Sequence, residues 1–166
     1  MNEKIIVVDD LYDMPHVYHG GFFENKCVIT DETVGKISQI LGRPISITEA
    51  TNEQGTSSGV VAHLGCDWIA VVYMSLPLEV FGEMGIKFYS HKQTGLEAFP
   101  TQDEMKFLQL DGGNLENIFS SDLDLWKEYG CVPARYNRLV MLKGNQWHSY
   151  NLNSDIKYQK IFVNYV

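Results

Sequence analysis

The spacing of apolar residues separates one helical segment from a series of strand-like segments. Apolar residues recur at helical spacing between Val34 and Leu41. Thr30 stands before this segment as a suitable N-cap residue, and Gly42 follows it as a residue that commonly ends helices. The pattern therefore predicts an amphipathic helix over residues 31–41.

Most of the remaining apolar runs are rich in β-branched and aromatic residues, which favour strands. These runs lie at residues 5–8, 44–48, 60–63, 68–74, 85–89, 138–142 and 158–165. The polar stretch at 52–59, NEQGTSSG, is typical of a turn. Residues 101–130 differ from the strand-like runs, because they are acidic and place Leu123, Trp126 and Tyr129 at helical spacing. We expect a helical insertion there, before the last strands.

Many short strands that follow one amphipathic helix in the sequence predict a mainly β fold with the helix packed on the sheet. A jelly roll is the natural architecture, since it buries apolar strands without leaving long edges. A length of 166 residues is that of a single domain over residues 1–166.

Charge and cysteine content narrow the class of protein. The net charge is −8, the pI is about 5.0, and no basic stripe is present, so we expect no nucleic-acid partner. The first apolar run has four residues between charged ones, which predicts neither a signal peptide nor a membrane span. Three cysteines without a metal-type CxxC spacing favour a reduced, cytoplasmic protein. A small molecule or a peptide is the expected binding partner, and a homodimer is compatible with these features.

Two histidines stand beside turns at the ends of strand-like runs. His63 follows the run that begins at residue 60, and His148 follows the run at 138–142 and its turn. Neutral imidazole binds iron, zinc or copper, and strand ends can converge at the mouth of a barrel, so the pair suggests a metal site. Hydrogen-bonded structural histidines are the competing interpretation. The alternative ligands are His16, His19 and His91.

Three segments around these histidines resemble a known family when they are taken in order. They are DWIAVVYMSLP at 67–77, FYSHKQTG at 88–95 and YNRLVMLKGNQWHS at 136–149. Their order is similar to that in the non-haem Fe(II)/2-oxoglutarate dioxygenase-like, prolyl-4-hydroxylase-like proteins. At the N-terminus, VVDDLYDMP and YHGGFF resemble that family's opening strand and its Tyr-x-Gly loop. The resemblance implies a double-stranded β-helix, which is a form of jelly roll.

The same resemblance assigns roles to individual residues. It makes His63 the proximal and His148 the distal ligand of an Fe(II) ion. Tyr73 would hydrogen-bond a carboxylate of the cosubstrate 2-oxoglutarate. Asn145 and Ser149 would hold the distal imidazole in place.

The sequence departs from the family pattern at three places. Gly65 replaces the aspartate of the His-x-Asp motif, and Asp67 is the next acid; we expect Asp67 to be the third metal ligand if Gly65 lets the chain turn back. The Gly-Gly-Thr turn is replaced by GEMG at 82–85. The last strand lacks the family's arginine for the far carboxylate of 2-oxoglutarate, so we expect Lys157, or alternatively Lys160, to supply the charge without the bidentate geometry of arginine.

Two functional hypotheses follow. The first is an Fe(II)/2-oxoglutarate-dependent oxygenase that hydroxylates a substrate of unknown identity. The second is a non-enzymatic, degenerate jelly roll that binds a ligand or partner in the same cleft. A zinc site that includes Cys66, and a halogenase-type site with an anion in place of the carboxylate, are further alternatives. Metal content and the distance between the two imidazoles discriminate among them.

Overall fold

The computed structural model describes residues 4–18, 27, 29–75 and 84–166. Residues 19–23 of the YHGGFF segment, including the alternative ligand His19, lie outside the described residues, and so does Gly82 of the GEMG turn. Within the described part of the chain, no helix is long and apolar enough to cross a membrane.

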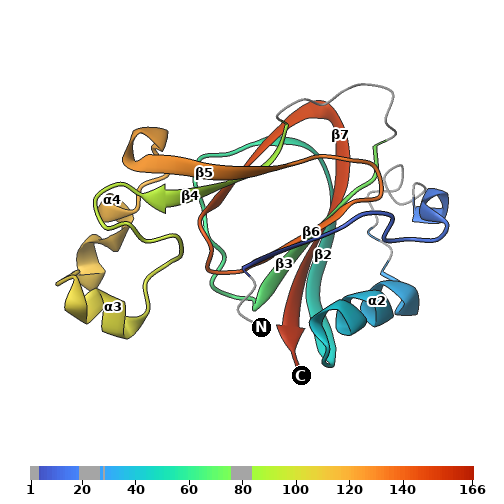
Figure 1. The fold of residues 1–166 in the computed structure, drawn as a ribbon, viewed down its shortest axis with the longest axis horizontal. Coiled ribbons are helices and arrows are strands. Elements are labelled where there is room, and N and C mark those ends of the chain that lie inside the picture. Colours follow the sequence, from blue (N-terminus) through green and yellow to red (C-terminus); the bar gives the residue numbers. More distant parts are fainter. Residues whose placement is uncertain (1–3, 19–26, 28, 76–83) are drawn as a thin grey trace.

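The architecture is a curled, antiparallel β-sheet (Figure 1). Its strands are β1 (Ile5–Val8), β2 (Ile45–Ser57), β3 (Trp68–Tyr73), β4 (Gly85–His91), β5 (Trp126–Pro133), β6 (Leu139–Lys143) and β7 (His148–Tyr165). The hydrogen-bonded order is β1-β6-β3-β7-β4-β5, and β2 also pairs with β7. Strand β7 is long enough to pair with β4 near its start and with β3 near its end. The mainly β, jelly-roll prediction is therefore confirmed.

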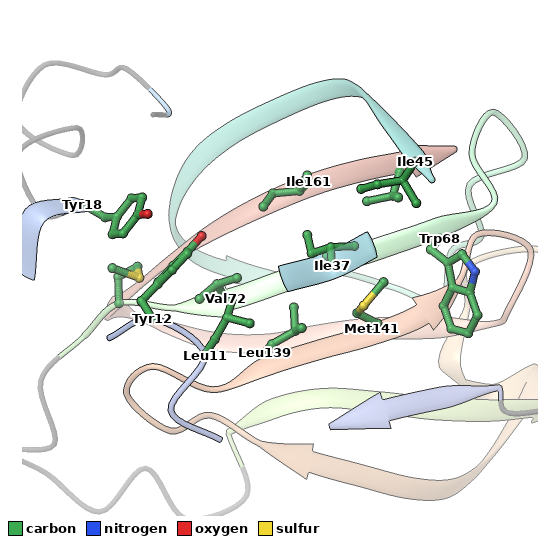
Figure 2. Packing of buried hydrophobic residues seen from close by; sticks show 13 residues of the cluster. Leu11, Tyr12, Tyr18, Ile37, Ile45, Trp68, Val72, Leu139, Met141 and Ile161 are labelled. Atoms are coloured by element: carbon green, nitrogen blue, oxygen red, sulfur yellow. The ribbon is translucent and has the colours of Figure 1, made fainter. Parts of the chain in front are cut away.

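The predicted N-terminal helix is present as α2 (Asp31–Leu41). The Thr30 hydroxyl accepts a hydrogen bond from the backbone N–H of Thr33, and Gly42 ends the helix with a φ of 68°. Ile37 of α2 is fully buried against the sheet. Figure 2 shows Ile37 lying among Val72, Met141 and Ile161, side chains that come from three different strands.

The sheet has two buried faces, and β3 is buried on both of them. Trp68, Ala70 and Val72 pack in the cluster that α2 covers, which we call the outer face. Residues 69, 71 and 73 alternate with them and pack in a second cluster, inside the curl of the sheet, which we call the interior face. A strand buried on both faces reads as a continuous apolar run, as residues 68–74 do.

The expected helical insertion is present between β4 and β5, but its boundary differs from the prediction. It contains α3 (Gln102–Phe107), η2 (Gly112–Asn114), α4 (Leu115–Ile118) and η3 (Leu123–Leu125), whereas a separate short helix, η1 (Pro15–Tyr18), lies near the N-terminus. The insertion lies at the opposite end of the sheet from α2 (Figure 1). Trp126 and Tyr129 belong to β5 instead, because residues 126–133 pair with β4 along its whole length. Helical spacing of three apolar residues was outweighed by this pairing.

Two further segments differ from the prediction. Residues 52–57 are not a turn but continue β2, where they pair with β7 along its length. Residues 60–63 form a loop with a single bridge from Val61 to His148, not a strand. His63 is therefore positioned by a loop.

Candidate functional site

His148 is fully buried at the first position of β7, opposite Phe88 of β4. Its Nδ1–H donates a hydrogen bond to the backbone carbonyl of Gln146 at 2.8 Å, since a carbonyl oxygen can only accept. That bond fixes the neutral tautomer with a lone pair on Nε2, and Nε2 has no hydrogen-bond partner. Burial lowers the pKa of His148 to about 4, with the neighbouring His63 and Lys160 adding to the effect. The imidazole is therefore neutral and able to bind a metal.

His63 comes to the same place from the loop before β3. Its backbone N–H donates to the carbonyl of Gly144 at 2.7 Å, so the turn between β6 and β7 anchors both histidines. The two imidazole centroids lie 5.6 Å apart. Burial lowers the pKa of His63, Lys160 lowers it further, and its Nε2 is also buried without a hydrogen-bond partner.

Two tyrosine hydroxyls on the interior face share this unsatisfied state. Tyr73 and Tyr150 are almost completely buried, and neither hydroxyl has a hydrogen-bond partner. Their rings belong to one row with those of the distal histidine and Tyr158: His148 to Tyr150 is 5.4 Å, Tyr150 to Tyr158 is 5.9 Å and Tyr158 to Tyr73 is 6.4 Å between centroids. Buried polar groups are almost always hydrogen-bonded in proteins, so the four unsatisfied atoms of these histidines and tyrosines are candidates for contact with a polar ligand.

Lys160, not Lys157, is the lysine that faces this region. Side chains alternate along β7, with Tyr158 on the interior face and Ile161 on the outer face. The Lys160 ammonium lies 5.6 Å from the centroid of Tyr150 and 5.4 Å from that of Phe162. The same alternation puts the side chain of Lys157, the lysine predicted to bind the cosubstrate, on the opposite face of β7.

Asp67 is held away from the two histidines. Its Oδ2 accepts a hydrogen bond from the backbone N–H of Tyr165 at 2.8 Å, and its own N–H donates to Asn164 and Val163 near the end of β7. Gly65 is not among the glycines with positive φ, so the expected backward turn does not form. Across the described ranges, no three His, Cys, Asp or Glu side chains are grouped as a metal site. The structure therefore does not bring Asp67 into a triad.

The other residues considered from the sequence lie elsewhere or act differently. Ser149 points to the opposite face of β7, where its hydroxyl contacts that of Tyr89 at 3.0 Å. His91 hydrogen-bonds Thr94 and packs against the aromatic rings of Phe119 and Trp126. Burial raises the pKa of the Cys66 thiol to about 11, which keeps it protonated and disfavours a zinc thiolate.

A cavity of about 360 Å³ opens beside His63. It is lined by Thr48, Glu49, Ala62, His63, Leu64, Gly65, Cys66 and Phe162. A second hollow of about 470 Å³ shares Ala62 and Leu64 with it and has apolar walls that include Phe99, Phe119 and Trp147. The indole N–H of Trp147 is buried without a hydrogen-bond partner. The first cavity is thus lined by His63, and the second hollow is connected to it through Ala62 and Leu64.

Sequence reasoning did not single out Tyr150 or Glu49. Tyr150 could have been found, because it stands two residues after His148 in one strand and must share its face. The position of Glu49 depends on an irregularity of β2 that no local pattern shows.

Solved structures that share the fold of this chain include HygX and SnoN. HygX from Streptomyces hygroscopicus, solved with nickel and 2-oxoglutarate bound, matches with a TM-score of 0.57 at 9% identity, covering 98% of this chain and 82% of that one. HygX with iron bound matches with a TM-score of 0.53 at 10% identity, over 96% and 81% of the two chains. The non-haem α-ketoglutarate-dependent epimerase SnoN from nogalamycin biosynthesis matches with a TM-score of 0.57 at 12% identity, over 98% and 79%. At these identities the likeness establishes the fold alone, which is a double-stranded β-helix.

Comparison of the sequence with known proteins identifies a family. No curated protein matches the chain. A family model matches residues 66–160, a range that contains β3 to the middle of β7 and includes His148, Tyr150 and Lys160. Because this match covers more than half of the sequence, the chain belongs to DUF6445, a family of unknown function.

Proposed function

We propose that this protein is an Fe(II)/2-oxoglutarate-dependent oxygenase. The observation that carries the proposal is the set of four buried, unpartnered polar atoms: the Nε2 atoms of His63 and His148 and the hydroxyls of Tyr73 and Tyr150. The fold shared with HygX and SnoN supports the same conclusion.

His63 and His148 are suited to hold the metal. Imidazole nitrogen is a good ligand for Fe(II), and a site with few protein ligands leaves positions open for other groups. The carbonyl of Gln146 orients His148 through Nδ1, as partners of metal-bound histidines commonly do. When bound, iron and 2-oxoglutarate would supply the oxidising chemistry, which the protein's side chains cannot provide.

Lys160 and the two tyrosines are suited to hold 2-oxoglutarate. The cosubstrate carries two carboxylates, and the Lys160 ammonium is the interior-facing cation beside Tyr150. Burial raises the pKa of both Tyr73 and Tyr150 well above the usual range, so each hydroxyl stays protonated and can donate to a carboxylate. We therefore assign Lys160 in place of Lys157 to the far carboxylate.

The primary substrate would lie in the apolar hollow beside the metal. That hollow shares Ala62 and Leu64 with the cavity that His63 lines, which supports this placement of the substrate. Its aromatic walls would exclude water from the reacting bond. A HygX structure holds hygromycin B together with nickel and 2-oxoglutarate, and we propose a small molecule, or alternatively a peptide, as the substrate of this chain.

A non-enzymatic domain is the second proposal, and the placement of Asp67 favours it. Without a carboxylate beside the histidines, the same interior would bind a carboxylate ligand through Lys160 and the tyrosines without turnover. Metal binding separates the two proposals.

The test is a titration of the metal-free protein with Ni(II), followed by 2-oxoglutarate, using isothermal calorimetry. Wild type should bind one equivalent of each, and His148→Ala should bind no Ni(II). Lys160→Met should lose 2-oxoglutarate affinity, whereas Lys157→Met, which changes the opposite face of the same strand, should keep it. Succinate formation by the Fe(II)-loaded protein then distinguishes an oxygenase from a binding domain. Absence of Ni(II) binding by the wild type would contradict the oxygenase proposal.

A further inference from the structure

We propose that Glu49 of β2 supplies the carboxylate that completes the metal site, from a different strand than the His-x-Asp pattern would use. This inference rests on the proposed metal-dependent function and assigns the ligand that Asp67 does not provide.

A β-bulge places Glu49 on the interior face. In the pairing of β2 with β7, Ile47 lies opposite Val163, but Glu49 lies opposite Phe162, so Thr48 is an extra residue in β2. Without that residue, Glu49 would share the outer face with Ile45 and Ile47, where a charge would be buried among apolar side chains. Bulges commonly redirect a side chain next to an active site, and this one places Glu49 on the face where it lines the cavity at His63.

The surroundings of Glu49 link it directly to His63. Both residues line the cavity of about 360 Å³, and the ring of Phe162, opposite Glu49, lies 5.3 Å from the imidazole of His63 between centroids. The negative charge of Glu49 also acts to raise the pKa of His63, against the larger effect of burial. Glu49 is exposed, and no described residue forms a hydrogen bond or ion pair with its carboxylate, so the side chain is free to turn toward a metal.

The neighbouring acids are less suitable. The carboxylate of Asp67 is held by the backbone of Tyr165. Glu53 lies on the same face of β2 as Glu49, further along the strand and opposite Tyr158. Its carboxylate accepts a hydrogen bond from the hydroxyl of Thr51 at 2.9 Å. Glu49 is thus the described acid that shares a cavity with a histidine of the pair.

A carboxylate at this position has a physical purpose. Two neutral imidazoles leave the charge of a divalent metal uncompensated, and the Lys160 ammonium on the same face adds another positive charge. One carboxylate with two histidines is the donor set of non-haem Fe(II) oxygenases, with the remaining positions open for other ligands. In the metal-free protein Glu49 would point into the cavity, and binding of the metal would draw it to the histidines.

The experiment measures Ni(II) affinity of the metal-free protein by calorimetry, without 2-oxoglutarate or turnover. Glu49→Gln should weaken Ni(II) binding by about tenfold or more. Glu53→Gln and Asp67→Asn are the matched controls and should bind as the wild type does. The visible spectrum of the Co(II)-loaded protein gives a second readout, since loss of a carboxylate ligand should change it in Glu49→Gln alone. Thermal unfolding of each variant shows whether it is folded.

Each outcome decides a different point. Equal Ni(II) affinity and an unchanged Co(II) spectrum in Glu49→Gln would overturn the role of Glu49 while leaving the metal site intact. Loss of affinity in Asp67→Asn with none in Glu49→Gln would overturn it in favour of Asp67. If the wild type itself binds no metal, the proposed function fails together with this inference.

Discussion

Replacing Gly144 with alanine should move His63 and destabilise the fold. Gly144 lies in the turn between β6 and β7, directly against the loop that carries His63. A Cβ on residue 144 would lie 2.2 Å from the backbone oxygen of Cys66 and 2.6 Å from that of His63, well below the 3.0 Å that real Cβ atoms keep. Both obstacles are backbone atoms, so the 63–66 loop or the turn must shift by most of an ångström.

The size of the effect follows from these contacts. Forcing extra atoms into such a packed position costs about 1–3 kcal/mol. The shift also strains the hydrogen bonds from His63 N–H to Gly144 and from Gly144 N–H to Asp67, at 2.7 and 3.1 Å. Each is worth about 1 kcal/mol, so we expect a total loss of about 2–4 kcal/mol. For a chain of this length, that lowers Tm by roughly 10 °C.

Urea denaturation followed by fluorescence measures the stability, and Ni(II) calorimetry follows the displacement of His63. The matched control is Gly65→Ala in the same loop, where a Cβ meets no atom within 4 Å and φ is not left-handed. The control should unfold within about 0.5 kcal/mol of the wild type. Equal stability of Gly144→Ala and wild type would refute the close contact between the turn and the His63 loop.

Three further predictions concern stability. Ile37→Ala removes a fully buried side chain from the face of α2 that packs on the sheet. The free energy of unfolding, measured in urea, should fall by about 2–5 kcal/mol, with Ni(II) affinity unchanged. A loss below about 1 kcal/mol would contradict the packing of α2 on the sheet. Tyr12→Phe removes the hydroxyl that donates to the buried Gln159 at 2.9 Å and should cost about 1–3 kcal/mol, measured in the same way. His148→Gln tests pH dependence in the metal-free protein. Because the pKa of His148 is about 4 in the fold and 6.5 unfolded, its neutral form contributes stability that is complete above pH 6.5 and is lost as the pH falls toward 4, about 3 kcal/mol in all. The difference in unfolding free energy between pH 7 and pH 4.5 should shrink in the variant, and an unchanged difference would count against the neutral, buried imidazole.

The sequence by itself determined the elements whose signals are local. Helix α2 has its bounds as predicted, because Thr30 and Gly42 supply caps that depend on neighbouring backbone groups alone. The continuous apolar, β-branched runs at residues 68–74 and 138–142 were enough to predict β3 and β6. The number of strand-like runs along the chain was enough to predict a jelly roll. The positions of His63 and His148 beside turns suggested a metal site, with hydrogen-bonded structural histidines as the alternative. Their assignment as the two ligands of one iron came from a resemblance spread over most of the chain.

The tertiary structure decided which face each side chain occupies. In a strand, a shift of one residue reverses every side chain, so register and bulges set the direction. The bulge at Thr48 turns Glu49 inward, and the continuous pairing of β7 puts Lys160 inside and Lys157 outside. Pairing with β4 made residues 126–133 a strand, and hydrogen bonds from the end of β7 held Asp67 away from the histidines. These outcomes depend on partners far away in the sequence, and no local pattern of hydrophobic and polar residues contains them.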